Sequence, residues 1–359
     1  MKGTSSGAPR IISWNITLRC PLKCAHCYVD AGDREAEQAL STEEAFDVID
    51  QIRAAGKPVV VLSGGEPLLR EDVYDIAAYG TSRGLRVGMG TSGFLIDRGA
   101  ALRLREAGIR AVAISLDSAD PQVHDAFRGV SGVWERAVQA IRLCQAEGIG
   151  IQINMSVMHP AMKEIEGVIR LGTSLGVRDY QLFFPVPTGR AWGMDPIRPQ
   201  EYEDLIRQVL IRFRDNDLNI RPTCAPQFRR IASDLGISNP AWGRGCIAGI
   251  SYCRIYANGD VTPCPYLPVR VGNIRNTPFS ELWERSPVFT ALRDNDTLTG
   301  KCGRCSFRRD CGGCRARAYN HAGSVSPGWC DGLAEPDLLN GDLCSEDPFC
   351  PYEPEVVAQ

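Results

Sequence analysis

The sequence lacks the features that mark most membrane and nucleic-acid-binding proteins. It has no run of ~18 apolar residues, and its first ten residues show no signal-peptide pattern. The 359 residues include 40 basic and 43 acidic side chains, so the net charge of −3 leaves neither sign in excess. This balance gives no sign of a nucleic-acid or polybasic membrane partner. We therefore expect a cytoplasmic protein without a membrane span and without a nucleic-acid partner.

Cysteine is scarce over one long stretch and dense in another. Of 15 cysteines, only Cys144 lies between Tyr28 and Ile220, whereas ten lie from Cys246 to Cys350. In a cytoplasmic chain such a set indicates metal ligands rather than disulfides. The length allows one large or two medium domains. We expect one domain at 1–220, a bridge at 221–245 and a cysteine-rich domain at 246–359.

Short apolar segments alternate with helical patterns in the first of these domains. The predicted strands are 11–18, 58–62, 85–90, 111–117, 150–157 and 179–184. The predicted helices run from a capping box at Ser41 and Glu44 to Gly56, then 72–83, 97–107, 133–147, 161–175 and 199–214. Six strand–helix units predict an α/β fold, in which a parallel sheet closes into a full or partial barrel with helices outside. The chemistry of such a barrel lies at the carboxyl ends of its strands.

The unusual residues follow that polarity. They are Cys20, Cys24 and Cys27 after the first strand, Gly64, Gly65 and Glu66 after the second, Ser92 and Gly93 after the third, Ser115 and Asp117 at the end of the fourth, and Asn154 and Ser156 late in the fifth. Beyond Arg221 the helical periodicity fades. We expect a short helix at 227–235, a hairpin at 254–262 around Asn258-Gly259, and a helix at 277–292.

Three cysteines on one short loop, Cys20-Pro-Leu-Lys-Cys24-Ala-His-Cys27-Tyr28, can hold three irons of a [4Fe–4S] cluster and leave the fourth iron open. The alternative is a zinc site with His26 as its fourth ligand. The spacing and the place after a strand resemble the radical S-adenosylmethionine (SAM) superfamily, whose motif often has an aromatic residue before the last cysteine. Here His26 occupies that position and Tyr28 follows the last cysteine.

The resemblance also implies a set of cofactor-binding residues. Gly64, Gly65 and Glu66 are similar to the family's GGE segment, which contacts the methionine amino group. Ser115, Asp117 and Asn154 correspond by position to residues that contact the ribose and the methionine carboxylate, and Tyr28 completes the predicted set. The alternative is a glycine-rich turn followed by polar residues that cap the next helices.

The late cysteines resemble the SPASM extension of radical SAM enzymes. They depart from its usual motif in one spacing, since two residues instead of three separate Cys311 from Cys314. The resemblance implies two auxiliary [4Fe–4S] clusters, one held by Cys246, Cys253, Cys264 and Cys314 and the other by Cys302, Cys305, Cys311 and one late cysteine. For that last ligand we favour Cys350, with Cys330 and Cys344 on an inserted loop at 324–343. Cys144 and Cys224 are predicted to be structural. Zinc ribbons are the alternative for Cys302/Cys305 with Cys311/Cys314.

The resemblance implies that SAM binds the open iron, that an electron from a donor such as flavodoxin or ferredoxin cleaves it, and that the 5′-deoxyadenosyl radical oxidises a substrate. Segments 245–249, 260–268, 311–319 and 187–190 are like those of enzymes of alternative haem and haem-d-type pathways, which trim carboxylate side chains of iron tetrapyrroles. Such carboxylates suit arginines, for which the candidates are Arg190, Arg198, Arg229 and Arg230. Two alternatives remain: a maturase of a ribosomally made peptide, and a non-catalytic iron–sulfur electron carrier. The sequence names no catalytic side chain.

Overall fold

The computed structural model describes residues 7–157, 162–194, 197–240, 242–321 and 342–355. Within them the chain builds one curved ten-stranded sheet, in the order β10-β9-β8-β1-β2-β3-β4-β5-β6-β7. Its strands are β1 Ile11–Asn15, β2 Val59–Ser63, β3 Arg86–Thr91, β4 Ala111–Ser115, β5 Gly150–Ser156, β6 Asp179–Phe183, β7 Asn219–Thr223, β8 Tyr252–Ile255, β9 Asp260–Thr262 and β10 Gly272–Asn273. Strands β1 to β8 pair in parallel, and only β9 and β10 are antiparallel.

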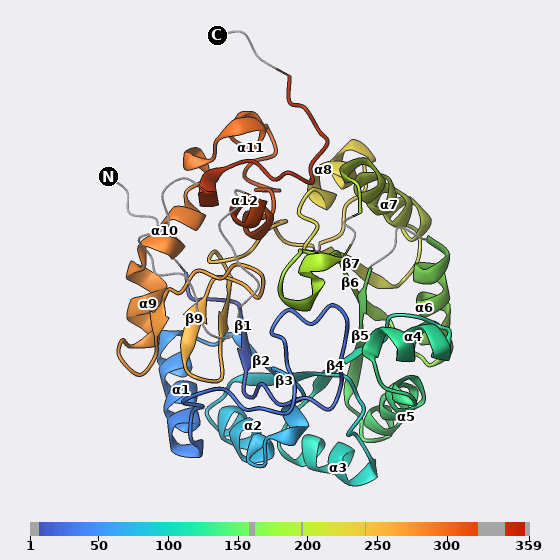
Figure 1. Ribbon diagram of the computed structural model, residues 1–359, viewed down its shortest axis with the longest axis vertical. Helices are drawn as coiled ribbons and strands as arrows, with labels where there is room; N and C mark the ends of the chain where they lie inside the picture. Colours follow the sequence, from blue (N-terminus) through green and yellow to red (C-terminus); the bar gives the residue numbers. More distant parts are fainter. Residues whose placement is uncertain (1–6, 158–161, 195–196, 241, 322–341, 356–359) are drawn as a thin grey trace.

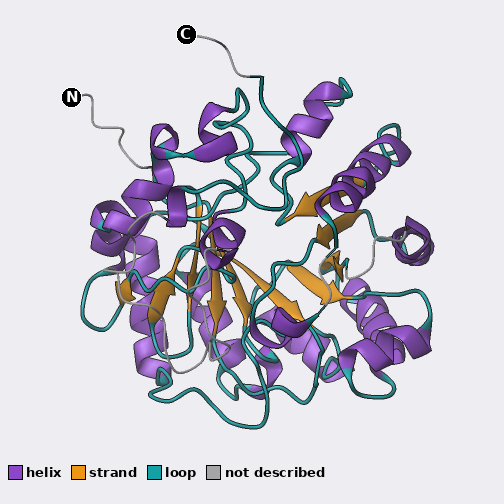
Figure 2. Cartoon of the chain, turned by 45° about the horizontal axis from the view of Figure 1, so that its top comes forward, coloured by secondary structure: helices purple, strands orange, loops and turns teal. Residues whose placement is uncertain are grey.

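Helices cover the outside of this sheet, as expected for strand–helix units that must bury both faces of a parallel sheet. They are α1 Thr42–Ala55, α2 Val73–Ser82, α3 Arg98–Glu106, α4 Pro121–Arg128, α5 Val133–Ala146, α6 Met162–Ser174, α7 Pro199–Arg212, α8 Phe228–Asp234, α9 Phe279–Arg285, α10 Pro287–Arg293, α11 Gly300–Arg304 and α12 Arg315–His321. Figure 1 shows α1, α2, α3, α5 and α6 following one another around the curved sheet, with α9 on the side of β9 away from β1. Figure 2 shows the strands gathered inside this ring of helices.

The predicted partial barrel is confirmed, and so is the capping box, in which Ser41 and Glu44 exchange side-chain and backbone hydrogen bonds at the start of α1. Each of the six predicted strands is present. No helix among the described residues is long and apolar enough to cross a membrane.

Four further strands, β7 to β10, extend the sheet beyond the predicted six. Strand β7 pairs with β6 and crosses the predicted boundary between the barrel and the bridge, and β8 pairs in parallel with β1, so that Cys253 lies opposite Ile12. The hairpin predicted at 254–262 is therefore part of the barrel sheet, and the sheet runs on past the predicted domain boundary at Cys246. The predicted single helix at 277–292 is wrong, because Pro287 starts a second helix after Ser286.

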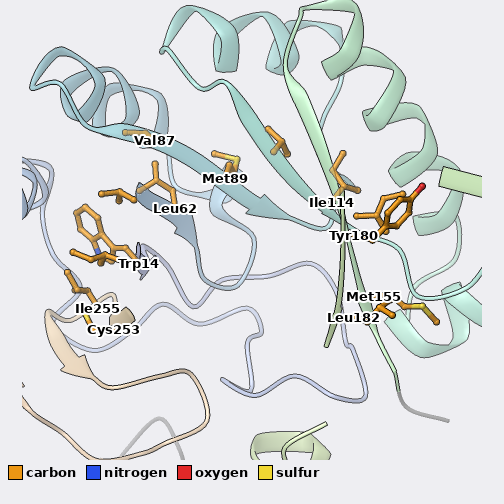
Figure 3. Packing of buried hydrophobic residues seen from close by; sticks show 14 of the residues in the cluster. Trp14, Leu62, Val87, Met89, Ile114, Met155, Tyr180, Leu182, Cys253 and Ile255 are labelled. Atoms are coloured by element: carbon orange, nitrogen blue, oxygen red, sulfur yellow. The ribbon is translucent and has the colours of Figure 1, made fainter. Parts of the chain in front are cut away.

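The apolar core lies between the sheet and the helices. Figure 3 shows Trp14, Leu62 and Met89 on neighbouring strands, with Cys253 and Ile255 beside Trp14. Trp14, Leu62 and Ile255 are fully buried. Because side chains alternate along a strand, the residues between these core positions point to the opposite, inner face of the barrel. The inner face of β1 therefore carries Ser13 and Asn15, which lead into the first cysteine loop.

Candidate functional site

The first cysteine loop follows β1 and is held by its own backbone. Cys20 N–H donates to the carbonyl of Gly32 at 2.7 Å, and Ala31 N–H donates to Cys27 Sγ at 3.3 Å. Cys24 is 8% exposed, whereas Cys20 and Cys27 are half-buried. Burial raises the pKa of the Cys20 thiol to about 12, with smaller contributions from Glu66 and the two other thiols. The loop thus presents three thiols near one buried carboxylate.

The turn after β2 packs directly against this loop. A Cβ on Gly65 would lie 2.2 Å from the Arg19 carbonyl oxygen, and one on Gly64, at φ +140°, would lie 2.3 Å from the Thr17 carbonyl oxygen. Gly65 N–H and Glu66 N–H donate to these same two carbonyls at 2.8 Å. The glycines are therefore required for close contact between two stretches of backbone, in addition to any ligand they admit.

Gly65→Ala is accordingly expected to lower the stability of the protein by about 1–3 kcal/mol, since the new methyl group meets backbone that cannot move without displacing the cysteine loop. Gly32→Ala, in the same loop, is the control, because a Cβ there has nothing within 4 Å. Thermal unfolding of the two variants measures the difference. Equal midpoints would show that the contact at Gly65 carries no strain.

Glu66 ties the second strand to the third. Its fully buried carboxylate accepts hydrogen bonds from Thr91 Oγ1 at 2.7 Å, from Ser92 Oγ at 2.5 Å and from Ser92 N–H at 3.1 Å. Burial raises the pKa of Glu66, and the hydrogen bonds from Ser92 and Thr91 oppose that rise. The structure thus gives Glu66 a bracing function, whereas contact with a cofactor ammonium group stays a prediction.

Both carboxylate oxygens of Asp117 accept hydrogen bonds from other parts of the chain. Its Oδ2 accepts from Arg128 Nε at 2.7 Å and its Oδ1 from Ser156 N–H at 2.9 Å. Burial acts to raise the pKa of Asp117, but the Arg128 guanidinium, together with two nearby histidines and the Ser156 N–H, holds the pKa below its usual value. Arg128 in turn reaches Cys24 Sγ through Nη1 at 3.7 Å. Asp117 thus positions an arginine against the cysteine loop, and its predicted contact with a cofactor stays a prediction.

Removing this arginine is expected to be costly. Arg128→Met leaves Asp117 as an unpaired buried charge, for which we expect a loss of about 3–5 kcal/mol of stability. Arg178→Met is the matched control, because Arg178 and Asp217 form an exposed ion pair whose loss changes stability by about 0.5 kcal/mol or less. Chemical denaturation of both variants provides the measurement, and similar losses would contradict the assignment.

The remaining predicted cofactor residues lie in two places. Ser115 and Asn154 are register partners at the carboxyl ends of β4 and β5, both half-buried, and Asn154 Oδ1 accepts from Gln152 Nε2 at 2.7 Å. Tyr28 instead turns toward β8, where its hydroxyl meets Arg254 and its ring lies 5.6 Å from that of Tyr266. These contacts leave a cofactor function of all three residues as a prediction.

His26 stacks on the ring of Phe127 in α4, with centroids 4.4 Å apart and the planes 4° from parallel. Burial, followed by the Arg128 charge, lowers the pKa of His26 to about 3, so the imidazole is neutral. Helix α4 carries Phe127 and Arg128, which both contact the cysteine loop. No helix was predicted from the sequence at this position. The sequence did contain a helix-start pattern, Asp120 followed by Pro121. In the structure Asp120 caps the helix by accepting hydrogen bonds from the N–H groups of its first turn.

Of the four arginines proposed as carboxylate receptors, Arg190 and Arg230 have partners elsewhere, whereas Arg229 Nε is buried with no hydrogen-bond partner among the described residues. Arg190 binds the Cys24 carbonyl at 2.8 Å and Asp30 at 2.7 Å, and it thereby fastens the first cysteine loop. Arg230 pairs with Glu203 and Asp234, Arg198 precedes α7, and Arg229 lies beside Phe228. An arginine that the sequence analysis passed over, Arg254, is buried in β8 with no ion pair among the described residues.

A first group of C-terminal thiols gathers beside the end of β7. Burial raises the pKa of Cys264 well above its ordinary value, and the neighbouring thiols that add to the rise are Cys314, Cys246 and Cys224. Cys224 was predicted to be structural, yet Cys314 and Cys246 are also the thiols that raise its pKa after burial. Its backbone has a φ of +58°, which is uncommon for a residue with a side chain and often marks functional sites.

Cys253 lies apart from this group. It is fully buried in β8 next to Ile255, and no cysteine contributes to the rise that burial causes in its pKa. Figure 3 shows it in the apolar layer outside the sheet, beside Trp14. Because neighbouring residues of a strand face opposite sides, Arg254 takes the inward position and Cys253 the outward one. The structure therefore separates Cys253 from Cys246, Cys264 and Cys314, with which the spacing had grouped it.

A second group surrounds an open hollow. Its lining includes Cys302, Cys305, Cys311 and Cys350, together with Gly312, Gly313 and Asp347. Asp347 N–H donates to Cys302 Sγ at 3.4 Å and Gly313 N–H to Cys311 Sγ at 3.5 Å. Cys344 lies in a different hollow, near Thr297, and Cys330 lies outside the described residues.

These donor sets suit iron–sulfur clusters. N–H groups that point at sulfur stabilise thiolates bound to iron, and both the first loop and the second C-terminal group provide them. Within the described ranges no three His, Cys, Asp or Glu side chains converge tightly enough for a single metal ion. The four cysteines instead surround a hollow, as a multi-atom cluster requires.

Comparison with known proteins gives consistent findings. The family model "Radical SAM superfamily" matches residues 14–172, and the SPASM model, "Iron-sulfur cluster-binding domain", matches residues 246–306. An AdoMet-dependent heme synthase of Methanosarcina barkeri (strain Fusaro / DSM 804) is 38% identical over 97% of this chain and 98% of its own length. A protein of the same name from Nitratidesulfovibrio vulgaris is 36% identical over 97% of this chain and 94% of its own. The solved structure of Streptococcus suis SuiB bound to S-adenosylmethionine covers 96% of this chain and 78% of that one, with a TM-score of 0.74 at 16% identity, a likeness of fold.

Proposed function

This chain belongs to the radical SAM superfamily and carries a SPASM iron–sulfur domain, and from that premise we propose that it removes carboxylate groups oxidatively from side chains of an iron tetrapyrrole, in the manner of haem synthesis. The proposed substrate class rests on the 38% identity to an AdoMet-dependent heme synthase, which extends over nearly the full length of both chains. A relationship of that extent includes the barrel, the bridge and the cysteine-rich region together.

We assign three [4Fe–4S] clusters to three groups of cysteines. Cys20, Cys24 and Cys27 hold the SAM-binding cluster, and Cys302, Cys305, Cys311 and Cys350 hold the outer auxiliary cluster around its hollow. The inner auxiliary cluster takes Cys246, Cys264 and Cys314, with Cys224 in place of Cys253. The contact at Gly245 supports this choice, since a Cβ there would lie 2.6 Å from the Pro226 carbonyl oxygen, so the chain just after Cys224 abuts the chain just before Cys246.

When bound, the first cluster and SAM supply a radical that takes one hydrogen atom from the substrate, and the auxiliary clusters supply an acceptor for one electron. For a propionate side chain the balance is the loss of that hydrogen atom, one electron and CO₂, which leaves a vinyl group. The electron that starts each turnover comes from an external donor such as flavodoxin or ferredoxin.

The chain's own residues prepare the first site. Arg128, fixed by Asp117, places a positive charge near Cys24 Sγ, where a sulfur bound to iron would carry negative charge. Glu66 fixes the turn on which the loop rests, and Arg190 ties the loop to η2 (Gly189–Gly193). Burial of Cys24 limits the access of water to the site.

The test is an anaerobic incubation of the reconstituted protein with SAM, a reductant and iron coproporphyrin III. We expect mass spectrometry to detect tetrapyrrole products that have lost CO₂ from propionate side chains, together with 5′-deoxyadenosine. An unchanged tetrapyrrole, with 5′-deoxyadenosine formed only when a precursor peptide is added, would replace this proposal with the peptide-maturase alternative. Absence of 5′-deoxyadenosine under all conditions would favour the electron carrier.

A further inference from the structure

Arg254 is a buried cation on the inner face of the barrel. It occupies β8 opposite Ser13 of β1, and it is 3% exposed. Its Nη2 donates to Asn15 Oδ1 and to the Tyr28 hydroxyl. Through these contacts it joins the C-terminal half of the chain to the residue that directly follows Cys27 in the first cysteine loop.

The donors around Arg254 outnumber the acceptors. Arg254 Nε and Asn15 Nδ2 are both buried with no hydrogen-bond partner among the described residues. Three other buried arginines, Arg128, Arg230 and Arg317, pair with carboxylates, while buried Arg315 donates to two backbone carbonyls and to Cys302 Sγ. The electrostatic neighbours of Arg254 are tyrosine hydroxyls instead. A buried charge without a counterion and buried N–H groups without acceptors are both costly, so an anionic acceptor would stabilise this arrangement.

Aromatic side chains surround this buried cation and are themselves less deeply buried than it is. Tyr28, Tyr252, Tyr256 and Tyr266 are each half-buried. The Arg254 guanidinium carbon lies 4.6 Å from the centroid of the Tyr28 ring and 5.8 Å from that of Tyr256. Tyrosines with part of each side chain exposed present flat apolar surface with polar tips, which suits a planar aromatic ligand.

The position of this group agrees with a substrate site. Tyr28 follows Cys27 of the first loop, and Tyr266 lies two residues after Cys264 of the inner auxiliary group, while the two rings meet edge to face at 5.6 Å. A ligand on Arg254 would therefore lie between the place where a hydrogen atom is removed and the place where an electron is accepted.

We propose that Arg254 and Asn15 form a receptor for one side-chain carboxylate of a planar aromatic substrate, with the four tyrosines as its rim. This assignment rests on the proposed function and adds the residues that recognise the substrate. A carboxylate offers only acceptors, and it can take N–H groups from the guanidinium and from Asn15 at the same time. A lysine would provide a point charge without that planar fork.

The experiment measures binding by the reconstituted holoprotein, without turnover, through the change in tetrapyrrole absorbance. The probes are iron coproporphyrin III and its tetra-amide, which keeps the shape and removes the charges. We expect the wild-type protein to prefer the acid, and Arg254→Gln to weaken binding of the acid by about tenfold to a hundredfold while the amide binds as before. Arg254→Lys should recover part of the preference. Iron content and the circular dichroism spectrum establish that each variant is folded and loaded.

Tyr28→Phe distinguishes recognition of the substrate carboxylate by Arg254 from a purely structural role of the contact between Arg254 and Tyr28. This variant removes only the hydroxyl that Arg254 contacts. If Arg254 recognises the carboxylate, this variant keeps the preference for the acid over the amide. The assignment is overturned if Arg254→Gln binds the acid as tightly as the wild type, or if Tyr28→Phe reproduces its loss, and the proposed function survives either result. If the wild-type protein binds neither probe, the tetrapyrrole proposal itself fails and this assignment fails with it.

Discussion

Cys24→Ala is expected to abolish the release of 5′-deoxyadenosine and to remove about four of the about twelve irons per chain that three [4Fe–4S] clusters require. Cys24 is the most buried of the three thiols in the first loop, and Arg128 reaches its sulfur. Two cysteines cannot hold a cluster that leaves only one iron open. Quantitative iron analysis and chromatography of the reaction mixture measure the two losses.

Cys144→Ala is the matched control for this prediction. Cys144 is fully buried in the middle of α5, away from the cysteine groups, and burial alone raises the pKa of its thiol to about 11. This variant should keep the full iron content and should release 5′-deoxyadenosine as the wild type does. Release by Cys24→Ala at the wild-type rate would remove the first loop from the chemistry.

Cys224→Ala is expected to damage the inner auxiliary cluster, whereas Cys253→Ala is expected to leave it intact. Cys224 lies with Cys246, Cys264 and Cys314, while Cys253 faces the apolar layer on the other side of the sheet. We expect the Cys224 variant to lose about four irons or, where a cluster persists on three cysteines, to change the electron paramagnetic resonance spectrum of the reduced protein. The Cys253 variant should keep both its iron content and its spectrum.

Iron analysis and spectroscopy of the two variants, prepared side by side, decide between the two cysteines. The opposite pattern, with iron lost from the Cys253 variant and retained in the Cys224 variant, would restore the ligand set that the sequence spacing indicates. Cys253→Ala also removes a buried side chain, so a lower unfolding temperature with full iron content is the expected result for that variant.

The strands of the barrel could be predicted because each is a short apolar run that ends in polar residues, as Val59–Ser63 does before Gly64 and Gly65. Strand β7 was not predicted because Asn219–Thr223 contains Arg221 and Pro222 and is therefore not an apolar run. Both residues are tolerated because β7 lies at the edge of the sheet. The pairing of β8 with β1 joins residues about 240 positions apart, and no local pattern reports a contact of that kind.

The residues of the candidate site were predictable as a set, but their partners were not. Spacing groups Cys253 with Cys246 and Cys264, yet spacing alone does not tell which face of β8 a side chain occupies. Asp117 has the position of a cofactor ligand, yet one of its oxygens accepts from Arg128, eleven residues later in a helix that was not predicted, and the other accepts from Ser156 N–H. Arg254 was passed over because it lies in a short strand beside a cysteine, and its significance depends on burial without a counterion.

The most direct test of the proposed reaction follows the hydrogen atom that is removed from the tetrapyrrole. Iron coproporphyrin III, deuterated at the propionate carbon adjacent to the ring, is incubated anaerobically with the protein, SAM and a reductant. The account predicts that deuterium appears in 5′-deoxyadenosine in step with the loss of CO₂ from the tetrapyrrole. If 5′-deoxyadenosine forms without deuterium and the tetrapyrrole keeps all its carboxylates, the radical has taken its hydrogen atom from another molecule. The central claim is then wrong.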